Sequence, residues 1–279
     1  MTDYQKENDK ILAEYKSEAA KNHEEFIADG LMFCGKVVDK GGYWERIRGN
    51  ESELYDKMSP KILLLTKDFP DDGGTEDIRI ENFRINGKVE PETSGRRFHQ
   101  NVMAHVWGLT HYMPDKGRCP KWSDEDFPWS WDDAREFYET NPIVRINMKK
   151  VPGKSSIDDK TLIGYMYNEK YRPILIKQIK LFNPDIIVCY SGAIFDFVIN
   201  PANGIIKDVN KTSGWAYYSP IHKKIIINSY HPSYFGIKEE TFYTDMMNSY
   251  ENILREHQGL ANAWFHNKKD KIGCKTLLQ

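Results

Sequence analysis

The chain has 279 residues, of which 39 are Lys or Arg and 41 are Asp or Glu, so its formal net charge is −2. Because 40% of the residues are hydrophobic and 29% are charged, the composition excludes disorder, collagen and coiled coil as descriptions of the whole chain. The balanced charge excludes a protein that coats nucleic acid by bulk electrostatics, since such domains are strongly basic. It leaves a small local binding site open.

Neither the start of the chain nor its most apolar stretch predicts a targeting or membrane segment. Residues 1–20 carry charges throughout and lack the apolar region of a signal peptide. Residues 186–199 are the most apolar, but this stretch is too short to span a bilayer. No C-x-x-C pair occurs among the cysteines, which are Cys34, Cys119, Cys189 and Cys274. We therefore expect a soluble, cytoplasmic protein without a metal site or a disulfide framework.

The first predicted element is a helix over residues 3–29, where apolar residues recur at helical spacing until Gly30 stops the pattern. Four nearly continuous apolar runs follow further along the chain, which is typical of strands covered on both faces of a sheet. These runs are residues 61–66 (KILLLT), 143–148 (IVRINM), 185–190 (DIIVCY) and 224–229 (KIIINS).

Helical patterns separate the four predicted strands. They cover residues 98–109, about 130–140, 159–182 with an interruption at Pro173, 191–199 and 238–257. This alternation predicts an α/β domain with a central, mainly parallel four-stranded sheet. We divide the chain into an N-terminal helical extension (1–59), the α/β domain (60–257) and a C-terminal tail (258–279). Two long loops, 67–97 and 111–129, interrupt the domain, and loops of that length are usually functional or insertions.

Polar residues follow three of the four predicted strands. Asp68 follows the first strand, Asn147 closes the second and His231 follows the fourth. Ligands of such sheets bind at the carboxyl ends of the strands, so we expect these side chains to meet at one edge. Phe98 opens the first helix after the first strand and would join them there. A carboxylate, an amide, an imidazole and an aromatic ring suit recognition and release of a planar heterocycle.

The order of four short motifs resembles that of the uracil-DNA glycosylase superfamily over residues 60–257. They are T-K-D-F-P at 66–70, G-R-R-F at 95–98, I-N-M-K-K-V-P-G-K at 146–154 and H-P-S at 231–233. The likeness is closest to the bacterial branch that includes the iron–sulfur, family-four enzymes. Because the cysteines of that cluster are missing here, no cofactor is expected. The resemblance implies a three-layer α/β/α fold and hydrolysis of the N-glycosidic bond of uracil or a related damaged base in DNA.

The resemblance also assigns roles to individual residues. Asp68 would stabilise the cationic sugar and orient water, as carboxylates do in glycoside hydrolysis. Phe98 would stack on the flipped base, Asn147 would read its edge, and His231 would face its carbonyl oxygen. Further contacts with the DNA are expected from six residues after the second and fourth strands. Lys149, Lys150, Lys154 and Ser233 would hold phosphates, and Tyr234 and Phe235 would form a wedge between bases.

Two other functions remain open at this point. A catalytically silent relative that binds single strands or damaged bases is one, because T-K-D-F-P lacks the glycine of the family's first motif. The other is an N-glycosidase acting on free nucleosides or nucleotides, because the long 67–97 loop could close the pocket against duplex DNA. Neither function needs an obligate protein partner or a membrane.

Overall fold

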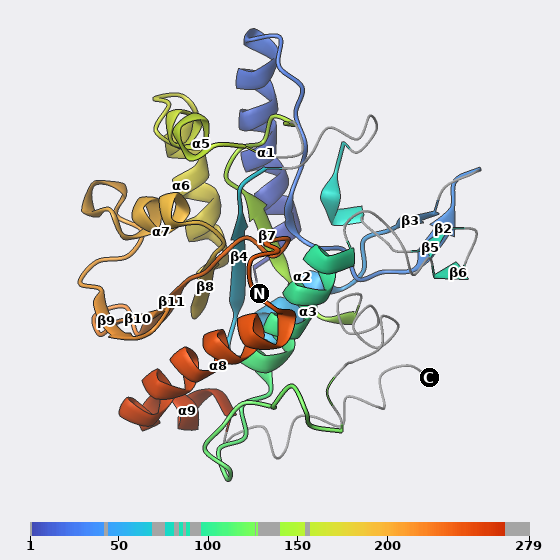
Figure 1. Ribbon diagram of the computed structural model, residues 1–279. Coiled ribbons are helices and arrows are strands. Elements are labelled where there is room, and N and C mark those ends of the chain that lie inside the picture. The colour runs from blue at the N-terminus through green and yellow to red at the C-terminus, as the bar shows by residue number, and fades with distance from the viewer. Residues whose placement is uncertain are drawn as a thin grey trace.

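The central feature of the computed structural model is a seven-stranded sheet (Figure 1). The structure describes residues 2–41, 44–68, 76–80, 84–85, 88–89, 96–125, 127, 140–153 and 157–265. In spatial order the strands are β1 (Gly30–Leu31), β7 (Val144–Asn147), β4 (Ile62–Thr66), β8 (Ile186–Cys189), β11 (Lys224–Asn228), β10 (Ala216–Ser219) and β9 (Asn210–Ser213).

All four predicted strands are present, and they form the parallel centre of the sheet. β4 pairs in parallel with β7 and β8, and β8 pairs in parallel with β11. The sheet is nevertheless larger than the expected four strands, because β1 adds to one edge and β10 and β9 to the other, all antiparallel. These edge strands lack the long apolar runs of the centre, so the sequence pattern did not reveal them.

The chain order of the parallel strands creates a switch point beside β4. From β4 the chain crosses to β7 on one side and then returns to β8 on the other. In open α/β sheets, ligands bind outside the carboxyl ends of the strands at such a point. The residues that follow β4 therefore occupy the part of the fold in which binding sites are most often found.

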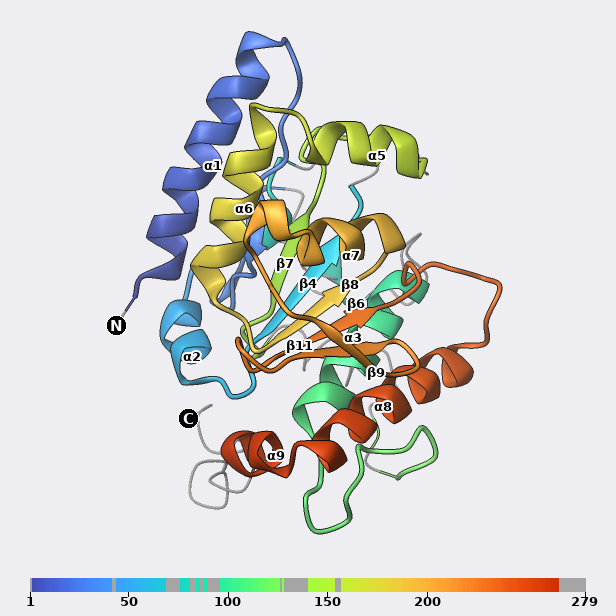
Figure 2. The same ribbon diagram turned by 90° about the vertical axis from the view of Figure 1, so that its left-hand side faces the viewer.

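Helices cover both faces of the sheet (Figures 1 and 2). One face carries α1 (Tyr4–Lys21), α5 (Asp159–Met166), α6 (Tyr171–Phe182) and α7 (Gly192–Ile199). The opposite face carries α3 (Arg96–Thr110), α8 (Glu239–Glu256) and α9 (Gln258–Phe265). Side chains of β4 alternate between the two resulting cores: Leu63 and Leu65 join the first, whereas Ile62 and Leu64 join the second. This alternation explains why the strand is apolar on both faces.

Short elements complete the described fold. These are the hairpin of β2 (Val37–Asp39) and β3 (Trp44–Arg46), the hairpin of β5 (Arg84–Ile85) and β6 (Lys88–Val89), helix α2 (Glu51–Lys57), and the 3-10 turns η1 (Ile78–Ile80) and η2 (Pro201–Asn203). Both hairpins stand apart from the central sheet in their hydrogen bonding.

The helix pattern is close to that expected. Helices occupy the predicted segments 98–109, 191–199 and 238–257, and residues 159–182 form two helices, α5 and α6. The break lies before α6 rather than at Pro173, which sits in the first turn of α6 where a missing N–H is harmless. The helix predicted from Ser130 falls almost entirely outside the described residues.

The two ends of the chain differ from the expectation. The first helix ends at Lys21 instead of continuing to residue 29, and Gly30 lies in β1 of the main sheet. Because α1 packs on α6 and β1 pairs with β7, residues 1–59 are part of the domain and not an extension of it. Residues 258–265 form α9, which buries Trp264 and Phe265, so the prediction of a tail is wrong for these residues. Among the helices that the structure describes, none combines the length and the apolar character needed to cross a membrane.

Candidate functional site at the carboxyl ends of β4, β7 and β11

Asp68 lies two residues beyond β4, with its side chain only 9% exposed. Its Oδ2 atom is 3.9 Å from Lys149 Nζ and has no hydrogen-bond partner among the described residues. Burial raises the pKa of this carboxyl, while the charges of Lys149 and Lys67 oppose the rise. Desolvation with an unused acceptor leaves the carboxylate oxygen available to a cation, a water molecule or a ligand N–H.

Gly153 makes room for the carboxylate of Asp68. A Cβ atom built on Gly153 would lie 2.2 Å from Asp68 Oδ2, a separation that no real side chain tolerates. The glycine thus permits close approach of the backbone rather than an unusual turn. It belongs to the V-P-G run after β7, so the β7 and β4 strand ends are packed directly on each other.

Asn147 is the last residue of β7 and pairs in register with Thr66 of β4. The Thr66 hydroxyl donates a hydrogen bond of 2.5 Å to Asn147 Oδ1, and the Asn147 backbone N–H donates to Asp29 Oδ2 at 2.8 Å. The side chain is buried, yet Nδ2 finds no hydrogen-bond partner within the described part of the chain. Such an amide offers unused donors to an acceptor on a ligand.

Phe98, in the first turns of α3, lies beside His231, which follows β11. Their ring centroids are 5.5 Å apart with the planes tilted by 40°. The guanidinium carbon of the buried Arg145, on β7, lies 5.5 Å from the centre of the Phe98 ring. Arg145 and Asn147 are two positions apart on β7, so their side chains lie on the same face of the strand. The contact of Arg145 with Phe98 therefore links the Phe98–His231 pair to the strand that carries Asn147.

His231 is held as a neutral imidazole. The Ser233 backbone N–H donates to His231 Nδ1 at 3.3 Å, which assigns the ring proton to Nε2. Burial, assisted by the positive charge of Lys67, lowers the pKa of His231 to about 4. The ring therefore presents an N–H donor at neutral pH without carrying a charge. Because the charge of Lys67 acts on His231, His231 lies on the same side of the sheet edge as the chain segment that carries Asp68.

Helix α3 holds the loop that follows His231. The Asn101 side chain donates to the Pro232 carbonyl at 2.6 Å, and the Arg97 guanidinium donates to the Ile237 carbonyl at 2.6 Å. Arg97 also pairs with Glu239 at 3.5 Å. These contacts fix the relative placement of Phe98 and His231, because both ends of the loop are tied to the same helix turn.

An exposed aromatic group adjoins His231. Tyr230 and Tyr234 are 47% and 44% exposed and stack with their ring centroids 5.0 Å apart, while Phe235 is 80% exposed. The guanidinium carbon of Arg97 lies 5.0 Å from the centre of the Phe235 ring. The exposure of Tyr234 and Phe235 is compatible with the wedge expected of them.

The four residues predicted to contact phosphate lie in different environments. Lys150 is buried and its ammonium pairs with Asp29, 2.5 Å from Oδ2, so the expectation that it contacts phosphate is wrong. Lys149 is partly buried and donates to the Val151 carbonyl at 2.6 Å. Ser233 is partly buried, and its backbone N–H binds His231. Lys154 lies outside the described residues.

Sequence reasoning missed several residues of this region: Asp29, Thr66, Arg145 and Gly153. Each acts on a predicted residue rather than replacing it, through a hydrogen bond, a ring contact or the space that it leaves. Only Thr66 and Gly153 carried a signal, since both fall inside motifs that the sequence singled out. Asp29 and Arg145 looked like ordinary charged residues.

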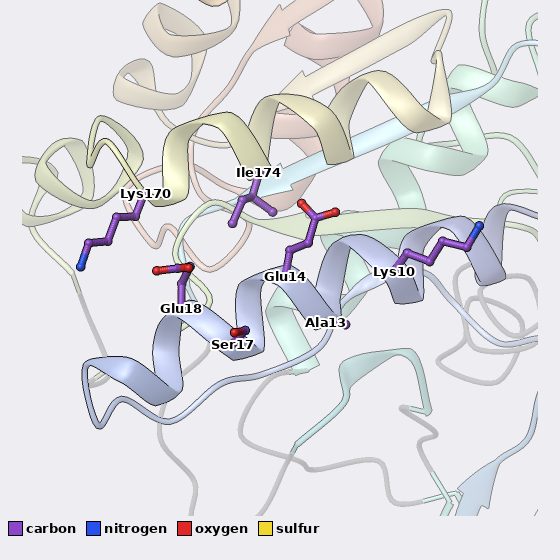
Figure 3. A pocket seen from close by; sticks show the side chains of 7 residues that line it. All are labelled: Lys10, Ala13, Glu14, Ser17, Glu18, Lys170 and Ile174. Atoms are coloured by element: carbon purple, nitrogen blue, oxygen red, sulfur yellow. The ribbon is translucent and has the colours of Figure 1, made fainter.

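A separate surface hollow lies between α1 and α6 (Figure 3). It is lined by Lys10, Ala13, Glu14, Ser17, Glu18, Lys170 and Ile174, and none of the residues expected at the site is among them. Three of the charged side chains that line it form ion pairs: Glu14 with Lys177, Lys10 with Glu7, and Glu18 with Lys21. The described residues also contain no group of three or more His, Cys, Asp or Glu side chains placed to bind a metal ion.

No family model matches the sequence, and no curated protein matches it.

Proposed function

We propose that the chain is a DNA base glycosylase that hydrolyses the N-glycosidic bond of uracil or a related damaged base, as in base excision repair. One observation carries the proposal: the Asp68 carboxylate, desolvated and with one oxygen unused, lies at the end of β4 beside the strand that ends in Asn147. The family likeness, including a three-layer α/β/α domain of the uracil-DNA glycosylase type, belongs to the same proposal, as do a cytoplasmic location and the absence of a cofactor.

Recognition of the base rests on Phe98 and Asn147. The target nucleotide leaves the stack at a cost of about a few kcal/mol, which is least for mismatched or single-stranded bases. Stacking on an aromatic ring such as Phe98 returns roughly 1–3 kcal/mol. The unused donors of Asn147 Nδ2 bind an acceptor on the base edge.

Bond cleavage divides the developing charges between Asp68 and His231. As the bond between C1′ and the base nitrogen breaks, its electron pair leaves with the base and the sugar becomes cationic. Asp68 stabilises that cation and orients the water molecule that adds to C1′, and the proton that the water loses balances the negative charge of the released base. The neutral His231 donates from Nε2 to the base oxygen on which negative charge grows, in the manner of an oxyanion hole.

Contacts with the rest of the DNA come from the surface around His231. The exposed rings of Tyr234 and Phe235 enter the gap left by the extruded base. Lys149, Lys154 and Ser233 hold flanking phosphates and set the register of the strand. Lys150 does not contact phosphate, since its buried ammonium is paired with Asp29.

The test is release of base from a uracil-containing oligonucleotide, read as strand breaks after alkali. Asp68→Asn keeps the side-chain shape but removes the charge, and we expect it to slow release at least about a hundredfold. Asp196→Asn is the matched control, because Asp196 is an exposed carboxylate on α7, and its activity should equal that of the unaltered protein.

Four outcomes would contradict or redirect the proposal. If neither uracil nor any other deaminated or alkylated base is released, the proposal of an enzyme is wrong. Binding of the oligonucleotide without release would indicate a catalytically silent relative. Release from free nucleosides but not from an oligonucleotide would identify a nucleosidase. Equal activity of Asp68→Asn and Asp196→Asn would remove Asp68 from the mechanism.

A further inference from the structure

Residues 27–32, which contain β1, lie along the outer edge of β7. This segment contacts the strand that carries Asn147 on the side away from β4. Backbone bonds fasten its two ends: Ile27 N–H donates to the Lys150 carbonyl and Met32 N–H to the Ile143 carbonyl, each at 2.9 Å. Between them the ladder is interrupted at Asn147, whose N–H is met by the carboxylate of Asp29 at 2.8 Å. A side chain thus replaces the backbone acceptor at the residue that closes the strand.

The Asp29 carboxylate is completely buried and fully occupied. Lys150 Nζ lies 2.6 Å from Oδ1 and 2.5 Å from Oδ2, and Gln178 Nε2 donates to Oδ1 at 2.9 Å. Both side chains of the ion pair are 0% exposed. Buried ion pairs repay their desolvation poorly as a source of stability, and their best-attested use is to fix one arrangement of the chain.

The alternation of side chains after β7 puts this ion pair and the candidate site on opposite sides of one short segment. Met148 and Lys150 face the core that contains α1 and α6, where Asp29 and Gln178 lie. Asn147 and Lys149 face the other way, toward Thr66 and Asp68. Because Asp29 binds this segment at Asn147 N–H and at Lys150 Nζ, it fixes the direction in which the side chains of Asn147 and Lys149 point.

We propose that Asp29 is a positioning residue, whose carboxylate, neutralised by Lys150, holds the backbone of Asn147 so that its amide and Lys149 face the ligand. The hold on the Asn147 backbone follows from the contacts alone, whereas its consequence for ligand binding rests on the proposed function. The N-terminal segment thereby becomes part of the functional unit, although it contributes no group that touches the substrate.

Two double variants separate positioning from general stabilisation. Asp29→Asn with Lys150→Met removes both buried charges but keeps an oxygen that accepts the Asn147 N–H. Asp29→Leu with Lys150→Met also removes both charges and leaves that N–H without an acceptor. Gln178→Leu is the third variant, since it disturbs the same carboxylate without touching its bond to Asn147.

Amide hydrogen exchange, read residue by residue by NMR, is the direct measurement. We expect protection of the Asn147 amide to fall about tenfold in the Leu double variant and to stay unchanged in the Asn double variant and in Gln178→Leu. Protection of Leu64 and Val188 in the sheet centre should be alike in all three. If the Leu double variant does not fold, Asp29→Ser with Lys150→Met takes its place, because serine is too short to make the contact.

Affinity for a uracil-containing oligonucleotide supplies the functional measurement. It should weaken about tenfold in the Leu double variant alone. Equal Asn147 protection in the two double variants would overturn the positioning role, whatever the activity. Selective loss of Asn147 protection in a protein that neither binds nor cleaves the oligonucleotide would uphold the positioning of Asn147 and overturn the proposed function.

Discussion

Burial favours the neutral form of both Asp68 and His231. It raises the pKa of the Asp68 carboxyl and lowers that of His231 from 6.5 to about 4. For His231 the folded value lies below the unfolded one, so its contribution to stability is complete above about pH 6.5 and is lost as the pH falls toward 4. For Asp68 the folded value is higher, so folding loses stability as the pH rises through the range between its unfolded and folded pKa values.

The pH dependence of base release should follow from these two shifts. On the proposed mechanism, activity needs the Asp68 anion and neutral His231. The acid limb of the rate profile should therefore lie above the ordinary range of a carboxyl, because burial raises the pKa of Asp68. His231, with a pKa of about 4, should add no limb near 6.5. Rate profiles of the unaltered protein and of His231→Gln provide the measurement. An acid limb near 6.5 that disappears in His231→Gln would contradict the prediction.

At the scale of elements, the sequence predicted those parts whose signal is local. The strands β4, β7, β8 and β11 are buried on both faces and stand out as apolar runs, so the sequence pattern predicted all four. Of the edge strands, β1 has only two residues and β9 is polar (NKTS), so neither forms an apolar run. They could not be distinguished from loops.

The end of α1 and part of the candidate site also depend on contacts that leave no local signal in the sequence. The charged run after Lys21 is compatible with a longer helix, but His23 adopts a positive φ of 56° and the chain turns to form β1. Asp29 matters only because that turn brings it to Asn147, 118 positions further along the chain. A contact of this kind depends on tertiary structure and leaves no local pattern.

Packing between strand ends can be tested at Gly153. We expect Gly153→Ala to displace the Asp68 carboxylate, since the added Cβ would lie 2.2 Å from Oδ2, and to lower base release at least about tenfold. Thermal melting should show a loss of about 1–3 kcal/mol from the overpacked contact.

Gly164→Ala is the matched control for this substitution. Gly164 lies within α5, and no atom lies within 4 Å of the place that an added Cβ would take, so the exchange should leave activity unchanged and stabilise the protein by about 0.5–1 kcal/mol. Unchanged activity in Gly153→Ala would show that Asp68 tolerates displacement and does not work at a fixed place.

At the scale of the whole molecule, the net charge of −2 limits how the chain can hold DNA. Three of the described cations near the candidate site are already paired: Lys67 lies 2.9 Å from Asp159, Lys149 lies 3.9 Å from Asp68, and Arg97 lies 3.5 Å from Glu239. Each would exchange a protein partner for a phosphate, so little free energy is gained by the exchange. Under the proposed function, affinity for DNA would then come mainly from the extruded base and from the exposed aromatic rings.

A shallow dependence of binding on salt is the consequence. Each phosphate neutralised on a single strand contributes a slope of about −0.7 to the logarithm of the binding constant against the logarithm of salt concentration. With about two or three phosphates held, we expect a slope near −2, measured with Asp68→Asn and a single-stranded uracil oligonucleotide so that the substrate stays intact. Adding Lys149→Met to Asp68→Asn should make the slope shallower by about 0.7, whereas adding Lys10→Met, on the far surface of α1, should not change it. A slope steeper than about −5 would contradict the prediction, because it would require a basic surface that binds the DNA backbone independently of the extruded base.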